Sequence, residues 1–254
     1  MDIKRFPREM KYQSSADLAQ FDEVEKLFKM SKERISDKLD AFPKYASRQS
    51  IAKFLTKYEI FKKIKNVNGS IIECGVLYGG GLLAWAKLSS ILEPVNHTRR
   101  IIGFDTFEGF PSVNKKDTMT GDSSHFSDDG MVGSSYEELK KIIGLYDLNR
   151  PINHIPKVEL VKGDIIKTAP KFLKENPHLV VSLLYLDLVI YEPTKAAILT
   201  FLPRMVKGSI IVFDELNAEL YPGETLAVEE VIGLKNLKIQ RFEFDSYVSY
   251  AIIG

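Results

Sequence analysis

Hydrophobic residues recur at two different periods along the chain, and the change falls near Gly69. Before it, apolar residues return every three or four positions, which is the spacing of amphipathic helices. One such series covers residues 18–28 and a second covers residues 51–64, with Pro43–Arg48 as a predicted loop between them. Residues 1–68 are therefore predicted to form a helical extension, which either caps the pocket of the following domain or forms a subunit interface.

After Gly69, short apolar runs alternate with helical stretches. Strands are predicted over Ser70–Gly75, Arg100–Asp105, Val158–Val161, Val180–Leu186 and Ser209–Phe213. Helices are predicted over Gly81–Ser90, Tyr136–Leu145, Ala169–Glu175 and Thr194–Met205. Near-continuous apolar strands separated by helices are typical of a parallel sheet that is covered on both faces. Residues 69–254 are thus predicted to form one doubly wound α/β domain.

The last two apolar segments, Lys238–Phe244 and Tyr247–Ile253, are joined by only Asp245 and Ser246. So short a connection permits a hairpin and excludes a parallel crossover. The sheet is therefore predicted to be mostly parallel, with six strands in one direction and one antiparallel strand near the C-terminus.

Composition and charge narrow the function classes. The 254 residues include 35 Lys and Arg against 34 Asp and Glu, so the net charge of +1 gives no overall field for binding nucleic acid or an anionic membrane. The single cysteine, Cys74, excludes an internal disulfide framework and a Cys-rich zinc site. No apolar stretch has the roughly 20 residues of a membrane span, and Met1–Arg5 begins a polar segment unlike a signal peptide. We therefore expect a soluble, cytoplasmic protein.

Carboxylates end four of the five predicted parallel strands. They are Asp105, Asp164, Asp187 and the pair Asp214-Glu215. The carboxyl ends of parallel strands meet at one edge, where open α/β sheets bind their ligands. Buried carboxylates need a cation or hydroxyl donors as partners, so this edge is the predicted binding site. Each carboxylate can alternatively be a loop residue or a helix N-cap, and for Asp164 both interpretations stay open.

A glycine-rich turn, Glu73–Gly81, follows the first strand. Glycine lets the backbone approach a ligand closely and adopt positive φ angles. The run Gly75-Val76-Leu77 breaks the G-x-G spacing of the dinucleotide fingerprint, which argues against a nicotinamide-dependent oxidoreductase. Asp105 ends the next strand, and a carboxylate at that place suits the two hydroxyls of a ribose.

Asp187, Asp214 and Glu215 are predicted to form a metal site, because they end neighbouring strands. Three carboxylates and waters make the oxygen-only shell that Mg²⁺ or Ca²⁺ prefers. Without a cation the three groups would repel and raise one another's pKa. Glu215 can alternatively face solvent.

Other catalytic residue types give weaker signals. Three of the four histidines are expected at the surface: His97, His154 and His178. His125 lies in the long polar stretch Ser112–Ser135, a length that is typical of a functional loop, and it is a candidate base. Cys74, Ser123 and Ser124 show no accompanying base and orienting group, so nucleophilic catalysis is not supported.

Several of these segments match a known family. They are Ile72–Gly81, Gly103–Pro111, Tyr191–Thr194, Gly208–Glu215 and Tyr221–Glu224. They resemble the macrocin-type O-methyltransferases, and most of all the branch that methylates calicheamicin rhamnose. The likeness runs from about Phe42 to the C-terminus, and Phe-Asp-Thr-Phe-Glu-Gly-Phe-Pro, which ends at Pro111, is its most specific run.

The resemblance implies a class I methyltransferase fold and an enzyme that uses S-adenosylmethionine (SAM) with Mg²⁺ or another divalent cation. Its substrate would be a small molecule, methylated on a hydroxyl of a nucleotide sugar, glycoside or natural-product glycoside. We expect a homo-oligomer without nucleic-acid or membrane partners.

The resemblance also implies which residues hold the cofactor and the metal. The expected SAM contacts are Glu73, Gly75, Tyr78, Gly79, Asp105, Thr106, Asp164 and Asp187. Among them, Glu73 would lie at the methionine end, Asp105 at the ribose and Asp164 near the adenine. The implied metal ligands are Asp187, Asp214 and Glu215, where the family more often has two aspartates in place of Asp214-Glu215.

One position departs from the family pattern. The family typically has a second aspartate, proposed as the catalytic base, where this chain has Val189, which cannot accept a proton. Three interpretations stay open. A metal suffices with water as the proton acceptor, another residue such as His125 or Glu192 is the base, or the chain binds SAM with little or no catalysis.

Overall fold

The structure is a computed structural model of the chain and describes residues 14–119, 126 and 131–254. The chain divides into two compact units, Met1–Leu55 and Thr56–Gly254, and the boundary lies inside helix α4 (Arg48–Ile64). No helix in the described part of the chain combines the length and apolar character that crossing a bilayer requires.

The first unit contains α2 (Ser15–Met30), α3 (Ile35–Asp40), the 3₁₀ turn η1 (Phe42–Lys44) and the start of α4. The Lys38 ammonium donates to the carbonyl oxygens of Phe28 and Ser31 and thereby ties α3 to the end of α2. The Phe28 ring meets the Tyr45 ring edge-on, with centroids 4.9 Å apart. Several large apolar side chains of this unit are exposed: Leu27, Met30, Ile35, Leu39 and Phe42.

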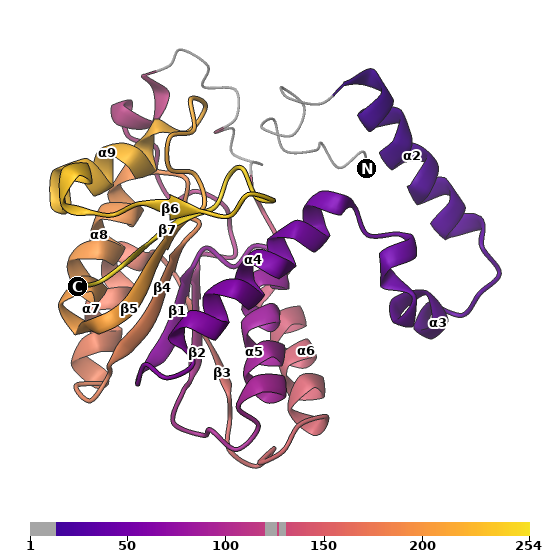
Figure 1. The fold of residues 1–254 in the computed structure, drawn as a ribbon, viewed down its shortest axis with the longest axis horizontal. Coiled ribbons are helices and arrows are strands. Elements are labelled where there is room, and N and C mark those ends of the chain that lie inside the picture. The colour runs from indigo at the N-terminus through magenta and orange to yellow at the C-terminus, as the bar shows by residue number, and fades with distance from the viewer. Residues whose placement is uncertain (1–13, 120–125, 127–130) are drawn as a thin grey trace. The chain divides into compact units, whose positions relative to one another are not determined.

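The second unit is built on a seven-stranded sheet in the order β3-β2-β1-β4-β5-β7-β6 (Figure 1). Its strands are β1 (Ser70–Cys74), β2 (Ile101–Asp105), β3 (Val158–Lys162), β4 (Val181–Leu186), β5 (Met205–Phe213), β6 (Gln240–Arg241) and β7 (Ser249–Ile252). The first five pair in parallel, and β7 pairs antiparallel with both β5 and β6. Six strands therefore run one way and β7 runs the other, which confirms the predicted fold class.

Helices cover both faces of the sheet (Figure 1). One layer contains the C-terminal part of α4, α5 (Gly80–Leu92) and α6 (Tyr136–Leu148), and the other contains α7 (Ile165–Glu175), α8 (Tyr191–Phe201) and α9 (Pro222–Val231). Trp85 is the largest buried side chain of the first layer, whereas Phe104 packs against Phe172 and Phe201 in the second. Burial on both faces explains why β1 and β4 consist of near-continuous apolar residues.

The helix boundaries differ from the predicted ones. α7 begins a turn earlier because Asp164 caps it, accepting from Ile166 N at 3.0 Å. The predicted helix at Thr194–Met205 is α8 followed by the 3₁₀ turn η4 (Leu202–Arg204), and Met205 already begins β5. α3, α9 and the 3₁₀ turns η2 (Lys115–Thr118) and η5 (Leu234–Asn236) were not predicted, because short segments give too few periods for a clear pattern.

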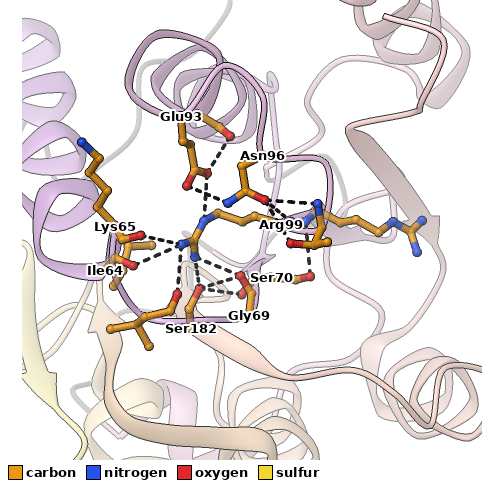
Figure 2. Close-up of polar contacts among 12 residues, drawn as sticks. Ile64, Lys65, Gly69, Ser70, Glu93, Asn96, Arg99 and Ser182 are labelled. Carbon is orange, nitrogen blue, oxygen red and sulfur yellow. Dashed lines mark hydrogen bonds and ion pairs between the residues drawn. The ribbon is translucent and has the colours of Figure 1, made fainter. Parts of the chain in front are cut away.

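A buried arginine organises the amino edge of the sheet (Figure 2). Arg99 is 3% exposed, and its Nε donates to Glu93 Oε1 at 2.8 Å. Its two terminal nitrogens donate to one hydroxyl and to carbonyl oxygens: Ser182 Oγ, Gly69 O, Ile64 O, Lys65 O and Val67 O. Arg99 thus uses all its donors and closes the C-terminal end of α4 against the starts of β1 and β4.

Candidate functional site

Backbone hydrogen bonds bring the strand ends into register at the carboxyl edge. Asp187 N donates to Cys74 O at 2.8 Å, and Asp214 N donates to Leu186 O at 3.0 Å. The residue that follows each strand therefore lies beside the last residue of its neighbour. This register places the predicted carboxylates along one edge, as the parallel topology requires.

A pocket of about 660 Å³, part of it open to solvent, lies at this edge. Five of the eight residues predicted to contact the cofactor line it: Gly75, Asp105, Thr106, Asp164 and Asp187. Most of the rest of its lining is apolar and comes from the loops after β1, β2 and β4: Leu77, Phe110, Pro111, Leu188, Val189, Ile190 and Pro193. A mostly apolar concave lining with a few convergent polar groups is typical of a small-molecule site.

Gly75 allows the ends of β1 and β4 to approach each other. Its φ is +90°, and a Cβ at this position would lie 1.9 Å from the carbonyl oxygen of Asp187. Any other residue would push the two strand ends apart. The pocket floor therefore depends on glycine at this position.

The Asp105 carboxylate organises the loops around the pocket. Oδ2 accepts from Val76 N at 2.7 Å and Leu77 N at 3.0 Å, and Oδ1 accepts from Phe107 N at 2.7 Å. An ionised carboxylate has about four acceptor positions, so one stays available for a ligand hydroxyl. The neighbouring Thr106 hydroxyl donates to Gly109 O at 2.6 Å and is used within the turn.

Val189 occupies a strained turn in the pocket wall. Its φ is +67°, a region that β-branched residues rarely adopt, and Ile190 N donates to Leu188 O at 2.7 Å across it. Such a conformation costs about 1–3 kcal/mol. The Val189 side chain is buried, so the position of the family's proposed base is an apolar part of the wall.

The three predicted metal ligands converge. One carboxylate oxygen from each of Asp187, Asp214 and Glu215 lies within 4.8 Å of the other two. Asp214 and Glu215 are buried, and Asp187 is half-buried in the pocket lining. The Tyr185 hydroxyl donates to Asp214 Oδ1 at 2.6 Å and fixes that carboxylate. The alternative that Glu215 faces solvent is wrong, because this side chain is 1% exposed.

Two further buried carboxyl groups lie near this cluster. Glu224 Oε1 accepts from Glu215 N at 3.0 Å, whereas its Oε2 is buried without a hydrogen-bond partner among the described residues. Burial, and next the charge of Asp214, raise the pKa of Glu224 well above its ordinary value. Glu73 accepts from Trp85 Nε1 at 2.6 Å, and burial raises its pKa to about 7 although Lys57 acts in the opposite direction.

Three of the residues predicted to contact the cofactor lie outside the pocket lining. Glu73 is buried beneath the start of α5, where a Cβ on Gly81 would come within 2.5 Å of its Oε1. Gly79 is the N-cap of α5, and the Tyr78 side chain is 52% exposed. Asp164 both caps α7 and lines the pocket, so it has the structural role that was considered as an alternative.

The candidate catalytic residues are placed as follows. Glu192 lies outside the pocket lining and accepts from Asn114 Nδ2 at 3.0 Å. His125, Ser123 and Ser124 lie outside the described residues. Cys74 is fully buried, and burial raises the pKa of its thiol well above the ordinary value, which makes it inert as a nucleophile. The other three histidines are exposed, as predicted.

Sequence reasoning missed the residues that support the carboxylates. Tyr185 lies inside an apolar strand, so its sequence context indicates only a core residue. Its position two residues before Asp187 indicates that it lies near the carboxylates. Glu224 lies in a segment that was noticed only for its likeness to the family. Asp117, whose buried side chain accepts from Tyr191 N, had no local signal.

The comparisons with known proteins agree with this geometry. The profile of the Macrocin-O-methyltransferase (TylF) family matches residues 58–250. The calicheamicin methyltransferase CalS11 has a similar structure, with a TM-score of 0.90 and 30% identity over 100% of this chain and 98% of CalS11. An apo structure of CalS11, described as a TDP-rhamnose 3'-O-methyltransferase, gives a TM-score of 0.83 and 30% identity over 96% of this chain and 97% of that one.

The O-methyltransferase NovP shares the fold, with a TM-score of 0.64 and 19% identity over 80% of each chain. No curated protein matches the chain significantly. The family profile covers most of the chain, and the strand order, the pocket and the likeness to CalS11 agree with it. The chain therefore belongs to the macrocin O-methyltransferase (TylF) family and is a SAM-dependent O-methyltransferase.

Proposed function

We propose that this enzyme transfers the methyl group of SAM to a hydroxyl of a sugar, carried on a nucleotide or in a glycoside, with a divalent cation at the carboxylate cluster. The observation that carries the proposal is the convergence of Asp187, Asp214 and Glu215 beside the pocket. CalS11, a TDP-rhamnose 3'-O-methyltransferase of similar structure, supports a sugar acceptor.

SAM would lie in the pocket between the loops after β1, β2 and β4. The free acceptor position of Asp105 suits a ribose hydroxyl. Asp164 and its apolar neighbour Ile165 also line the pocket and suit the adenine. Gly75 keeps the end of β1 close to Asp187 at the floor of the pocket, because a side chain there would collide with the Asp187 carbonyl oxygen. These positions would aim the methyl group toward the carboxylate cluster, where the acceptor binds.

The cluster suits a hard divalent cation. Its donors are carboxylate oxygens within 4.8 Å of one another, and an octahedral Mg²⁺ holds oxygens about 2.9–4.2 Å apart. Glu224 lies beside the cluster, where its Oε1 accepts from Glu215 N and its Oε2 lacks a hydrogen-bond partner among the described residues. Lys57, whose Nζ lies 3.5 Å from the centroid of the Tyr185 ring, supplies one positive charge against several carboxyl groups. Bound Mg²⁺ would orient the acceptor hydroxyls and lower their pKa.

Methyl transfer breaks the bond between sulfur and the methyl carbon and forms a bond to the acceptor oxygen, whose proton must leave. Val189 cannot accept this proton, and Glu192 is held by Asn114 outside the pocket lining. We infer that the proton passes to water, and His125, which lies outside the described residues, stays the alternative acceptor. The chain then contributes by aligning the two reactants, which is the larger requirement for an already activated methyl group.

The test is formation of S-adenosylhomocysteine from SAM with TDP-rhamnose and related nucleotide sugars as acceptors. We expect turnover that needs Mg²⁺ and is lost with chelator. Asp214→Asn should lower kcat/KM by more than about 100-fold, because losing a metal ligand costs more than losing one of its hydrogen-bond partners. Glu175→Gln is the control, because it neutralises an exposed carboxylate at the end of α7, outside the cluster. Full turnover in chelator, or an active Asp214→Asn variant, would contradict the metal site.

The apolar pocket wall at Val189 also favours a second candidate, a SAM-binding protein with little or no catalysis. Calorimetry separates the two functions. A wild-type protein that binds SAM with micromolar affinity but methylates none of the nucleotide sugars or glycosides supports the second candidate. Val189→Asp restores a proton acceptor, and a gain of turnover in this variant would identify the missing base as the cause.

A further inference from the structure

The segment that follows β2 ends against helices that follow two other strands of the sheet. We call residues Thr106–Thr118 the strap. Its first part lines the pocket through Thr106, Gly109 and Pro111. Its last turn, η2, contacts α9 and accepts a hydrogen bond from the first residue of α8, and these helices follow β5 and β4. The strap therefore joins the β2 side of the pocket to the side formed by the β4–α8 connection.

Asp117 makes this junction. Its side chain is 1% exposed, Oδ1 accepts from Tyr191 N at 2.7 Å, and Oδ2 accepts from Asn114 N at 2.7 Å. The N-cap of α8, Ile190, has no side-chain cap of its own. A carboxylate from a distant segment thus caps α8, where the helix dipole also favours a negative charge.

The residues around Asp117 leave just enough space for its carboxylate. A Cβ on Gly223 at the start of α9 would lie 2.2 Å from Asp117 Oδ1 and 2.6 Å from Tyr191 N, so only glycine fits there. Beside it, Asn114 Nδ2 donates to Glu192 Oε1 at 3.0 Å. Segments after β2, β4 and β5 therefore meet at one buried carboxylate.

The strained turn lies two residues before the bond to Asp117. Val189 has a φ of +67°, and the next two residues are Ile190 and Tyr191. A left-handed β-branched residue persists only where its surroundings over-determine it. The bond from Tyr191 N to Asp117 fixes the downstream end of the turn, and Ile190 N to Leu188 O closes the turn itself.

We propose that Asp117 is a positioning residue for the SAM pocket, holding the Val189 turn and the strap in their ligand-binding arrangement. This inference rests on the proposed function in taking the pocket as the SAM site. Asp117 does not line the pocket and acts through Tyr191 and Asn114.

The test is the Kd of SAM, measured by calorimetry on the full chain well below the unfolding temperature. Asp117→Ala should weaken SAM binding about 10-fold or more, because both buried donors lose a charged acceptor. Asp117→Asn keeps an acceptor for Tyr191 N but not for Asn114 N, and should give an intermediate Kd. Lys115→Met is the matched control, because Lys115 is in the same turn and its side chain is exposed. The control should bind SAM like the wild type.

A double-mutant comparison tests the link to the strained turn. Asparagine tolerates positive φ, so Val189→Asn should reduce the loss of SAM affinity that Asp117→Ala causes. Folded Asp117 variants with the wild-type Kd would overturn the proposal, even if their Tm falls. An equal loss of affinity with and without the Val189→Asn change would overturn the link to the turn. A wild-type protein that does not bind SAM would contradict the proposed function instead.

Discussion

At the amino edge of the sheet, Arg99 is buried with an acceptor for each of its donors, and its carboxylate partner Glu93 also receives the Ser89 hydroxyl. At the carboxyl edge, Glu73 and Glu224 are buried, and burial raises the pKa of both carboxyl groups. Glu224 Oε2 has no hydrogen-bond partner among the described residues. The sheet thus satisfies the buried charge of Arg99 with its own groups, whereas its carboxyl edge leaves a buried carboxyl oxygen without a donor.

Backbone strain is concentrated at the carboxyl edge. Four of the six non-glycine residues with positive φ among the described residues follow β1, β2, β4 or β5 within a few residues: Leu77, Phe107, Val189 and Asn217. The other two are Met131 and Ile152. Strain and unbalanced charge both cost stability, and they persist where binding a ligand offsets the cost. The difference between the edges therefore locates the site independently of any likeness to other proteins.

Arg99→Met, at the amino edge, should lower the stability of the fold more than the other two substitutions below. It leaves Glu93, whose side chain is 8% exposed, without its cation and leaves carbonyl oxygens at the end of α4 unpaired. Removing one partner of a buried ion pair costs about 3–5 kcal/mol in the free energy of unfolding. Arg100→Met is the control, because its pair with Glu159 is partly exposed and contributes at most about 1 kcal/mol. Similar losses in urea unfolding for the two variants would contradict the distinction.

Glu73→Gln, at the carboxyl edge, should remove a buried carboxyl group and reduce the pH dependence of the free energy of unfolding. The pKa of Glu73 is about 7 in the folded chain against 4.5 as the ordinary value. The folded state therefore holds this proton more tightly, and stability falls as pH rises from about 4.5 to about 7, by roughly 3 kcal/mol in total. Glutamine removes this loss and keeps an oxygen for Trp85 Nε1. Chemical unfolding in chelator at pH 5 and pH 8 measures the difference. A wild-type protein and variant with the same pH dependence would contradict the assignment.

The sheet could be predicted from the sequence because each of its strands is a local apolar run and parallel topology then dictates where the ends meet. The convergence of Asp187, Asp214 and Glu215 follows from that topology alone. Glu215 shows the limit of the approach, since no local pattern indicates that its side chain is buried or that its backbone N donates to Glu224, nine residues later.

Supporting residues could not be predicted in this way, because their roles depend on contacts between distant segments. Asp117 accepts from Tyr191 N across 74 residues, and no periodicity or motif reports such a bond. For Tyr78, whose side chain is 52% exposed, the expected contact with SAM stays a prediction.

Tyr185→Phe removes a hydrogen-bond donor from the carboxylate cluster at the carboxyl edge and leaves the amino edge unchanged. The Tyr185 hydroxyl, 2.6 Å from Asp214 Oδ1, holds that carboxylate in place, so its loss should weaken Mg²⁺ binding about 10–100-fold. That range corresponds to about 1.4–2.7 kcal/mol. Calorimetric titration of Mg²⁺ in the presence of SAM measures it. Tyr146→Phe is the control, since the Tyr146 hydroxyl donates to Ala86 O at 2.7 Å on the helices away from the site. Unchanged Mg²⁺ affinity in Tyr185→Phe would contradict this role of the hydroxyl, because it would mean that the surrounding packing alone holds the Asp214 carboxylate in its metal-binding orientation.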